Sequence, residues 1–335
     1  MTTAPPQNTN SRPGELRRSR LTGEWVAFAP ARGARPSDFA ATEQRAPAGP
    51  RDPDCPFCPG NEDMLAQVLQ EFPGETQGEW ALRAVANRFA ALSPEAAAPD
   101  SDRSRPAVGR HEVIVESPRH DASPATMDQM QTASLMQAWR ERWRDARRDP
   151  QVQHVVLFRN HGPSAGASLR HPHAQLAGLP LVPEAERRRL ARMTEWFDLQ
   201  GTGLLESIME QEARGPRKVF ENDGALAWVP WAANVPCEVV AAPKRRQADF
   251  GDCDDEALRD FGLALEHVLA AVYAKLSDPD YNLVLQGSPC GREADPALHW
   301  YATIRPRLTV RAGFEIGAGM RINPSWPEED ARFLR

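Results

Sequence analysis

The sequence predicts an α+β fold built from two copies of one unit, each an antiparallel sheet with packed helices. Short apolar runs typical of strands alternate with longer amphipathic stretches of helical period. Residues 111–120 resemble residues 237–245, and each segment precedes a predicted helix, an apolar strand and a loop containing Gly and Ser. Each loop leads to a histidine, His171 in the first copy and His299 in the second. We interpret this order as an internal duplication.

Length and charge restrict the class of protein. The 335 residues suffice for one large or two ordinary domains. A formal net charge of −6 argues against a nucleic-acid partner, whereas local arginines still permit small substrates that carry phosphate. Residues 1–14, rich in Pro, Asn and Thr, are predicted to be a disordered tail without the apolar region of a secretory signal. No apolar run approaches the length of a membrane span, so no membrane partner is expected.

The first predicted elements lie before residue 150. Residues 21–30 start with a Thr-Gly turn and continue as an alternating strand. Arg32 and Arg35 follow in a loop rich in Gly and Pro, where arginines are most often surface charge. Residues 110–116 form a strand that ends at Ser-Pro, and residues 128–148 form an amphipathic helix. Its apolar stripe, which starts at Met130 and includes Trp139, belongs to the core.

The remaining elements repeat this order. A strand over residues 152–158 leads into the polar loop, and a second extended run follows that loop. Further helices are predicted, and they lie at residues 184–200, 204–213 and 255–275. We therefore divide the chain into an N-terminal domain, 15–183, and a C-terminal domain, 184–335, after the tail.

Two of the five cysteines form the sequence Cys55-Pro56-Phe57-Cys58. Such a turn presents two thiolates to one tetrahedral ion, which then needs two further ligands from elsewhere. A redox pair is the alternative, but the flanking prolines and the lack of a strand-to-helix context disfavour it. This use of cysteine suits a reducing cytoplasm, the predicted location, better than a disulfide framework.

The chemistry is concentrated in residues 160–175. Gly166 and Ser168 lie in a loop whose backbone N–H and hydroxyl groups can surround a phosphate without adding charge. If the run that follows is extended, its period of two places His171, His173 and Gln175 on one face. A lone His-x-His is often a pair of solvated or core histidines, but the preceding loop and the amide favour a reaction site. A neutral imidazole is a good nucleophile near pH 7, and Gln175 can meet charge on a phosphoryl oxygen.

The motif Gly166-x-Ser168-x-x-His171-Pro172-His173-x-Gln175 resembles the signature of the galactose-1-phosphate uridylyltransferases, a branch of the histidine-triad superfamily. The resemblance extends from about residue 16 to the end of the chain. Its other segments appear in the order of the family, and they are Leu21-Thr22-Gly23-Glu24-Trp25-Val26, Cys55-Pro56-Phe57-Cys58, Ala86-Asn87-Arg88-Phe89 and Ser117-Pro118-Arg119-His120. It implies two histidine-triad-like halves, of which only the first keeps the His-x-His pair.

The resemblance also implies roles for single residues. It makes His173 the nucleophile, with Gln175 as its catalytic partner. It makes Cys55, Cys58, His120 and His171 the ligands of one structural zinc ion per chain. The residues that match nucleotide or phosphate contacts are Arg32, Arg35, Asn87, Asn160, Gly166, Ser168 and Gln175. The segment with the two arginines is often contributed across a dimer in this family, so a homodimer is expected.

The activity implied is that of a nucleotidyltransferase of carbohydrate and galactose metabolism. It would move a nucleoside monophosphate from a nucleotide sugar to a hexose 1-phosphate, by double displacement through a histidine-linked intermediate. Residues 313–324 lack the lysine and the Tyr-Glu pair that hold the hexose phosphate in that family, and they look closer to the ADP-glucose phosphorylase branch. The alternatives are therefore an ADP-sugar phosphorylase that uses inorganic phosphate, or a nucleotide-binding protein without catalysis.

Overall fold

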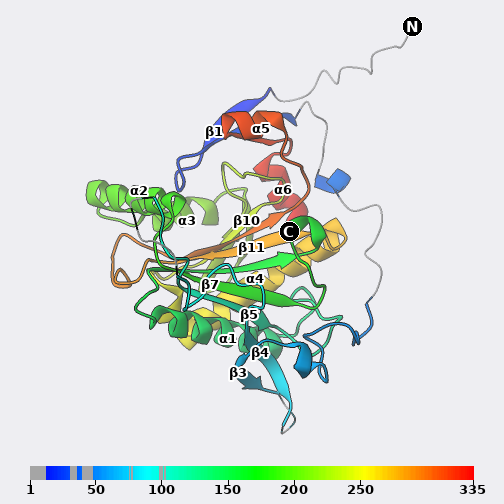
Figure 1. The fold of residues 1–335 in the computed structure, drawn as a ribbon. Helices are drawn as coiled ribbons and strands as arrows, with labels where there is room; N and C mark the ends of the chain where they lie inside the picture. The colour runs from blue at the N-terminus through cyan, green and yellow to red at the C-terminus, as the bar shows by residue number, and fades with distance from the viewer. Residues whose placement is uncertain are drawn as a thin grey trace.

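The structure is a computed structural model that describes residues 13–30, 36–39, 48–74, 76, 78–97, 101 and 103–335. Nearly all of the predicted tail, residues 1–12 of 1–14, lies outside these described residues. The fold is a mixed α+β arrangement around one large sheet, with helices on both of its faces (Figure 1).

The large sheet has ten strands in the order β3-β4-β5-β7-β6-β11-β12-β10-β9-β8, and the pairings given for it are antiparallel. Its first five strands are β3 (Val68–Pro73), β4 (Trp80–Ala86), β5 (Arg110–Val115), β6 (His154–His161) and β7 (His173–Leu179). The other five are β8 (Lys218–Glu221), β9 (Ala225–Trp228), β10 (Val239–Pro243), β11 (Tyr281–Gln286) and β12 (Tyr301–Pro306). The order of the second five mirrors that of the first, and β6 pairs with β11 at the centre.

Two long helices cover one face of this sheet. They are α1 (Gln129–Arg147) and α4 (Asp255–Leu276). Helix α1 connects β5 to β6, and α4 makes the equivalent connection from β10 to β11. The side chains of Asp128 and Asp254 accept backbone N–H groups at the two helix starts, which satisfies donors that the helix leaves free. The helices pack on each other, and α1 also packs on β6 and β7 while α4 packs on β9 and β10.

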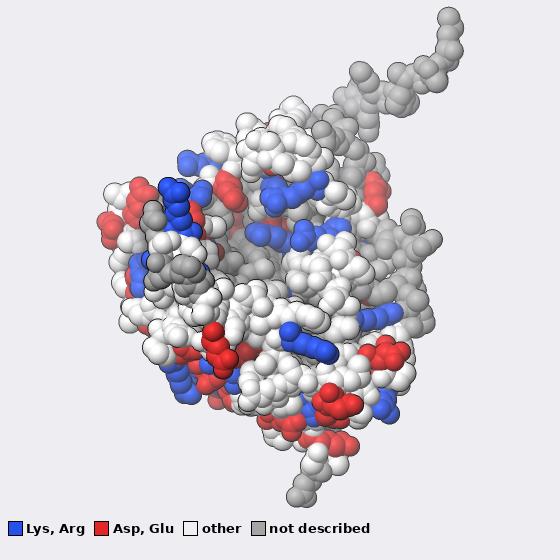
Figure 2. All heavy atoms as spheres, in the orientation of Figure 1, with Lys and Arg blue, Asp and Glu red and all other residues white. Residues whose placement is uncertain are grey.

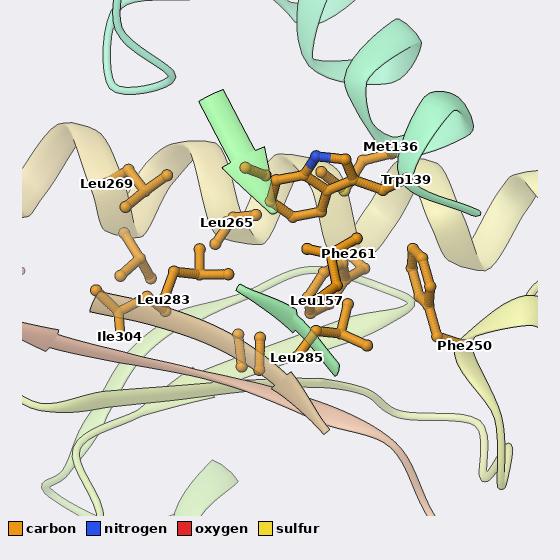
Figure 3. Close-up of a cluster of buried hydrophobic side chains, with 14 of the residues drawn as sticks. Met136, Trp139, Leu157, Phe250, Phe261, Leu265, Leu269, Leu283, Leu285 and Ile304 are labelled. Atoms are coloured by element: carbon orange, nitrogen blue, oxygen red, sulfur yellow. The ribbon is translucent and has the colours of Figure 1, made fainter. Parts of the chain in front are cut away.

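The main core lies between these helices and the sheet (Figure 3). Figure 3 shows Trp139 of α1 and Phe261 of α4 above Leu157 of β6 and Leu285 of β11. All four side chains are at most 1% exposed. Because strands alternate their side chains, the residues between these core positions face the opposite side of the sheet.

Two further helices and a small sheet lie over the opposite face of the large sheet. Helices α2 (Glu184–Gln200) and α3 (Leu204–Ala213) contribute to a second apolar cluster with Trp228 and Tyr301. A small sheet, β1-β2-β13, joins β1 (Glu15–Arg18) and β2 (Trp25–Phe28) to β13 (Arg321–Asn323). The short α5 (Gly313–Ala318) and the C-terminal α6 (Pro327–Leu334) complete the chain. No helix in the described part of the chain is long and apolar enough to cross a bilayer.

Most of the predicted elements are present. The predicted helices at 128–148, 184–200, 204–213 and 255–275 correspond to α1, α2, α3 and α4. The predicted strands over residues 110–116 and 152–158 are β5 and β6, and the extended run after the polar loop is β7. One detail of the apolar stripe was wrong, because Met130 of α1 is 69% exposed.

The packing of α1 makes a quantitative prediction. Trp139 is 1% exposed and fills the interior between α1 and the sheet. We expect Trp139→Ala to lower the free energy of unfolding by about 3–5 kcal/mol, because it removes buried apolar surface and leaves a cavity. Met130→Ala on the same helix should change it by no more than about 0.5 kcal/mol. Urea denaturation of both variants tests this, and equal effects would contradict the assigned face of α1.

Candidate active site and metal site

Four buried side chains form a compact group that is able to hold a metal ion. They are Cys55, Cys58, His120 and His171, and their ligand atoms all lie within 4.8 Å of one another. Cys55 and Cys58 belong to one turn, His120 follows β5, and His171 precedes β7. The four residues proposed from the sequence are therefore brought together by the fold.

The distances within this group suit tetrahedral coordination. Cys58 Sγ lies 3.5 Å from His120 Nδ1 and 3.6 Å from His171 Nδ1, and Cys55 Sγ lies 3.7 Å from His171 Nδ1. A tetrahedron with ordinary Zn–S and Zn–N bonds has S···N edges of about 3.6 Å. Burial raises the pKa of the Cys55 thiol to about 11, so a thiolate there needs a cation beside it. The residues present thus fit a divalent ion.

Hydrogen bonds orient His171, one of the two histidines of this group. The Nε2–H of His171 donates to the Ser117 carbonyl at 2.7 Å, which leaves Nδ1 unprotonated and directed at the two sulfurs. The backbone N–H of Asp52 donates to Cys58 Sγ at 3.3 Å. Burial lowers the pKa of His171 to about 4, which keeps its ring neutral and able to ligate.

His173 begins β7 two residues after His171 and is 6% exposed. Its Nδ1–H donates to the His171 carbonyl at 2.8 Å, so the lone pair is on Nε2. Burial lowers the pKa of His173, the hydrogen bond that its Nδ1–H donates to the His171 carbonyl opposes this, and the charge of Arg159 lowers the pKa further. Phe57, from the Cys-x-x-Cys turn, packs on the His173 ring with centroids 5.4 Å apart. The ring is thus neutral and held from two sides.

The loop between β6 and β7 has a conformation that depends on glycine. Gly162 and Gly166 have φ of +83° and +94°, values that residues with a side chain rarely adopt. The N–H groups of Ala165, Gly166 and Ala167 donate to carbonyls within the loop. We expected N–H groups near Gly166 to face a phosphate, but these three serve the turn instead. Gly166 thus shapes the loop, and Ser168, which is exposed, remains as a donor.

Residues of the C-terminal half hold this loop, which sequence reasoning did not anticipate. Asn282 donates through Nδ2 to Asn160 Oδ1 at 2.8 Å and to the Ala165 carbonyl at 2.9 Å. The Asp280 carboxylate accepts the Ser164 N–H at 2.6 Å. Because Asn282 occupies the Asn160 oxygen, the NH₂ group of Asn160 is turned the other way, toward Gly166. Nothing in the local sequence of β11 signals this function.

A second missed residue, His111, orients the amide of Gln175. The backbone N–H of Ala91 donates to His111 Nδ1 at 3.0 Å, so the proton of this ring is on Nε2. That Nε2–H donates to Gln175 Oε1 at 3.0 Å, and Asn87 Nδ2 lies 3.4 Å from the same oxygen. The Gln175 NH₂ group is then free to meet a phosphoryl oxygen.

A cavity of about 500 Å³ opens at the end of β6 and the start of β7. His173, Asn160 and Ser168 line it, whereas Asn87 and Gln175 lie outside its lining, along β4 and β7. Two arginines belong to the lining, of which Arg170 is exposed and Arg159 is buried in an ion pair with Glu116. Arg32 and Arg35, the other two residues predicted to bind the nucleotide, lie outside the described residues.

Lys and Arg also gather around a hollow on the face of the molecule that Figure 2 shows, beneath the segment labelled α5 in Figure 1. A cleft between that segment and the centre of the sheet is lined by Arg305, Arg307, Arg311 and Arg321 and also by Asn160. The predicted site therefore adjoins a second basic surface.

Comparison with known proteins identifies a set of relatives. Residues 7–183 match the family described as galactose-1-phosphate uridyl transferase, N-terminal domain. An ADP-glucose phosphorylase of Arabidopsis thaliana is 33% identical over 96% of this chain and 92% of its own length. A galactose-1-phosphate uridylyltransferase of Thermotoga maritima is 29% identical over 96% of this chain and 98% of its own length.

Solved structures agree with these relatives. The crystal structure of an ADP-glucose phosphorylase from Arabidopsis thaliana with bound ADP-glucose superposes with a TM-score of 0.83 at 30% identity, covering 97% of this chain and 98% of that one. A uridylyltransferase structure superposes with a TM-score of 0.74 at 28% identity, covering 95% and 96%.

The geometry of the four buried ligands predicts that the purified protein contains about one metal ion per chain. Cys55→Ser should remove most of this metal and lower the melting temperature, because metal binding contributes to folding. Cys290→Ser, a half-buried cysteine outside the group, should retain the metal. Elemental analysis with thermal denaturation measures both effects. A native protein without metal, or a Cys55→Ser protein with as much as the wild type, would refute the assignment.

Proposed function

The chain belongs to the galactose-1-phosphate uridylyltransferase family, and on this premise we propose that it transfers a nucleoside monophosphate from a nucleotide sugar through His173. The observation that carries the proposal is the hydrogen bond from His173 Nδ1–H to the His171 carbonyl, which leaves a buried, neutral Nε2 at the cavity. Such a nitrogen is prepared to attack phosphorus.

The reaction has two displacements. In the first, the lone pair of His173 Nε2 forms a bond to the α-phosphorus, the bond to the bridging oxygen breaks, and the sugar 1-phosphate leaves. In the second, an oxygen of the acceptor's phosphate attacks the same phosphorus and the P–N bond breaks. The proton stays on His173 Nδ1 throughout, and that N–H keeps donating to the His171 carbonyl. Both steps need donors for the non-bridging oxygens.

We propose that those donors are the NH₂ groups of Gln175 and Asn160 and the hydroxyl of Ser168. His111 and Asn282 support this assignment, because they occupy the oxygens of the two amides and leave the nitrogens to face a ligand. Gly166 would act through the loop conformation. Binding of the nucleotide by Asn87, Arg32 and Arg35 is proposed from the family resemblance alone.

We propose that the ion held by Cys55, Cys58, His120 and His171 is zinc. Two sulfurs and two imidazole nitrogens at tetrahedral spacing are the donor set that zinc favours. Four protein ligands leave no open position, so the ion would brace the segment that carries His173 and not touch substrate. What zinc supplies when bound is rigidity and deprotonation of the two thiols.

The acceptor is proposed to be a hexose 1-phosphate, as the names of several relatives indicate. A specific observation favours a second candidate, the phosphorolysis of an ADP-sugar. The ADP-glucose phosphorylase relative is 33% identical and the Thermotoga maritima uridylyltransferase 29%, and residues 313–324 hold no lysine. Inorganic phosphate would need only Arg170 and loop donors near His173.

We also propose that the chain arose by internal duplication, with halves at 15–183 and 184–335. The mirrored strand order supports this, as does a repeated contact, in which His171 Nε2 donates to the Ser117 carbonyl and His299 Nε2 to the Pro243 carbonyl. The pairing of β13 with β2 departs from a clean division, because it joins the two ends of the chain.

We propose a cytoplasmic homodimer. The exposed apolar side chains of Val310, Phe314 and Ile316 lie in and beside α5 and offer surface for a second copy. The cytoplasmic assignment rests on the unpaired cysteines, since all five are free thiols.

The role of His173 predicts a covalent intermediate. Mixing the enzyme with donor and no acceptor should add the mass of one nucleoside monophosphate per chain, visible by intact mass spectrometry. His173→Ala should form no adduct and should lose on the order of 10⁴-fold or more in rate, while keeping its metal. His267→Ala, on α4, serves as a control and should still be labelled. Full turnover by His173→Ala would exclude the mechanism.

The acceptor is tested by chasing the labelled enzyme. Enzyme loaded from UDP-glucose and from ADP-glucose is mixed separately with galactose 1-phosphate and with inorganic phosphate. We expect galactose 1-phosphate to discharge the uridylyl form, with recovery of the unmodified mass. Discharge by phosphate alone, and from the adenylyl form alone, would replace our first candidate by the second.

A further inference from the structure

The C-terminal half contains a cavity at the position that matches the nucleophile's surroundings in the N-terminal half. Strand β5 pairs Val113 with Gln175 of β7, and its counterpart β10 pairs Val240 with Thr303 of β12. Thr303 thus stands where Gln175 stands, and Tyr301, two residues earlier, stands where His173 stands. The residues that alternate with these, such as Ala174 of β7 and Ala302 of β12, belong to the core under α1 and α4. Gln175, Tyr301 and Thr303 therefore lie on the other face of the sheet.

This second cavity has a volume of about 280 Å³. Its floor is the sheet, with Trp228, Tyr301 and Thr303, and its walls are α3 and residues 18–22. Apolar lining comes from Leu21, Leu205, Ile208 and Val240, together with the partly exposed Trp231. The volume lies just below the range of about 300–1,000 Å³ that is usual for small-molecule sites. It therefore suits a ligand smaller than a nucleotide sugar.

The charged residues of the lining leave an excess of positive charge. Glu212 pairs with Arg217 at 2.7 Å, and Glu238 pairs with Arg305 at 2.7 Å. Arg18 and Arg20 remain, and within the described chain neither forms an ion pair with a carboxylate. Arg20 instead donates to Ser207 Oγ and lies over the ring of Trp196. Glu212, already paired with Arg217, also attracts Arg20, but the lining still holds four arginines against two glutamates. This excess of guanidinium groups favours an anionic group on the ligand.

Polar atoms with unused hydrogen-bonding capacity accompany this charge. Thr303 Oγ1, Glu212 Oε2 and Arg217 Nε are buried and have no hydrogen-bond partner in the described structure. Buried polar atoms without partners are rare in folded proteins because each costs free energy. The amides of Gln211 and Asn234 add paired donors and acceptors to the lining. This mixture matches the edge of a heteroaromatic base better than an alkyl chain.

We propose that this cavity is a second, non-reactive site for a nucleoside monophosphate. The base would lie against the apolar wall near Ile208, and the phosphate would meet Arg18 and Arg20. Transfer does not occur there, because Tyr301 replaces the nucleophilic histidine. Burial raises the pKa of Tyr301 to about 12, so its hydroxyl stays protonated and un-nucleophilic near neutral pH.

Equilibrium dialysis of the full chain with labelled AMP and labelled UMP tests this. Ile208→Trp places a larger side chain in the cavity, and we expect it to remove one bound monophosphate per chain. Labelling of His173 by donor should be unchanged in that variant, since the residue lies in the other half. Glu210→Gln, an exposed neighbour on α3, should bind as the wild type does.

A second variant tests the proposal even if Ile208→Trp does not fold correctly. Arg20→Gln removes the positive charge of one guanidinium group that would meet the phosphate. The affinity for the monophosphate should then fall about 10- to 100-fold. A stoichiometry that neither variant changes would overturn the proposal. So would binding of glucose 1-phosphate at this cavity in preference to both AMP and UMP, because it would show that no base is recognised.

Discussion

The structure depends on His171, which joins the candidate metal group to the candidate nucleophile. Its Nδ1 faces the sulfurs of Cys55 and Cys58, and its carbonyl accepts the hydrogen bond from His173 Nδ1–H. The carbonyl that fixes the tautomer of His173 thus belongs to His171, whose ring is itself part of the candidate metal group. Phe57, between the two cysteines, packs on the rings of both His171 and His173. If the proposed ion is bound there, it holds the ring of His171 and, through the His171 carbonyl, the direction of the lone pair on His173 Nε2.

A second constraint is the pairing of β6 with β11 at the centre of the sheet, which makes the two halves one functional unit. The loop that follows β6 has used several of its N–H groups to close its own turn, so its shape needs support from outside. Asn282 and Asp280, at the start of β11, provide that support across the central pairing. The C-terminal part of the chain thus orients the Asn160 amide, one of the proposed phosphate donors.

The sequence predicted the parts of the structure that local pattern determines. The four main helices follow from their periodicity, and the four residues of the candidate metal group were identified because the resemblance supplies their spacing. Contacts between distant segments were not predictable in this way, since Asn282 and Asn160 are 122 residues apart. The sequence alignment of the proposed repeat is also one residue out of step with the strand pairing. It set Glu112 against Glu238, but Glu112 pairs with Arg142 of α1 and Glu238 with Arg305 of β12, on opposite faces of the sheet. A shift of one residue in a strand exchanges its faces, and residue identity alone does not detect it.

The two halves cover equivalent sheet surface by different physical means. In the first half, Val85, Val113 and Val115 lie under the Cys-x-x-Cys turn, a short segment with little apolar area of its own. Such a cover gains stability from a bound ion because its few contacts cannot offset the entropy of ordering it. In the second half, α2 and α3 bring Leu190, Leu205 and Met209 onto the corresponding surface. This helical cover holds apolar contacts where the first part of the sheet has the candidate metal group, so the two covers are stabilised in different ways.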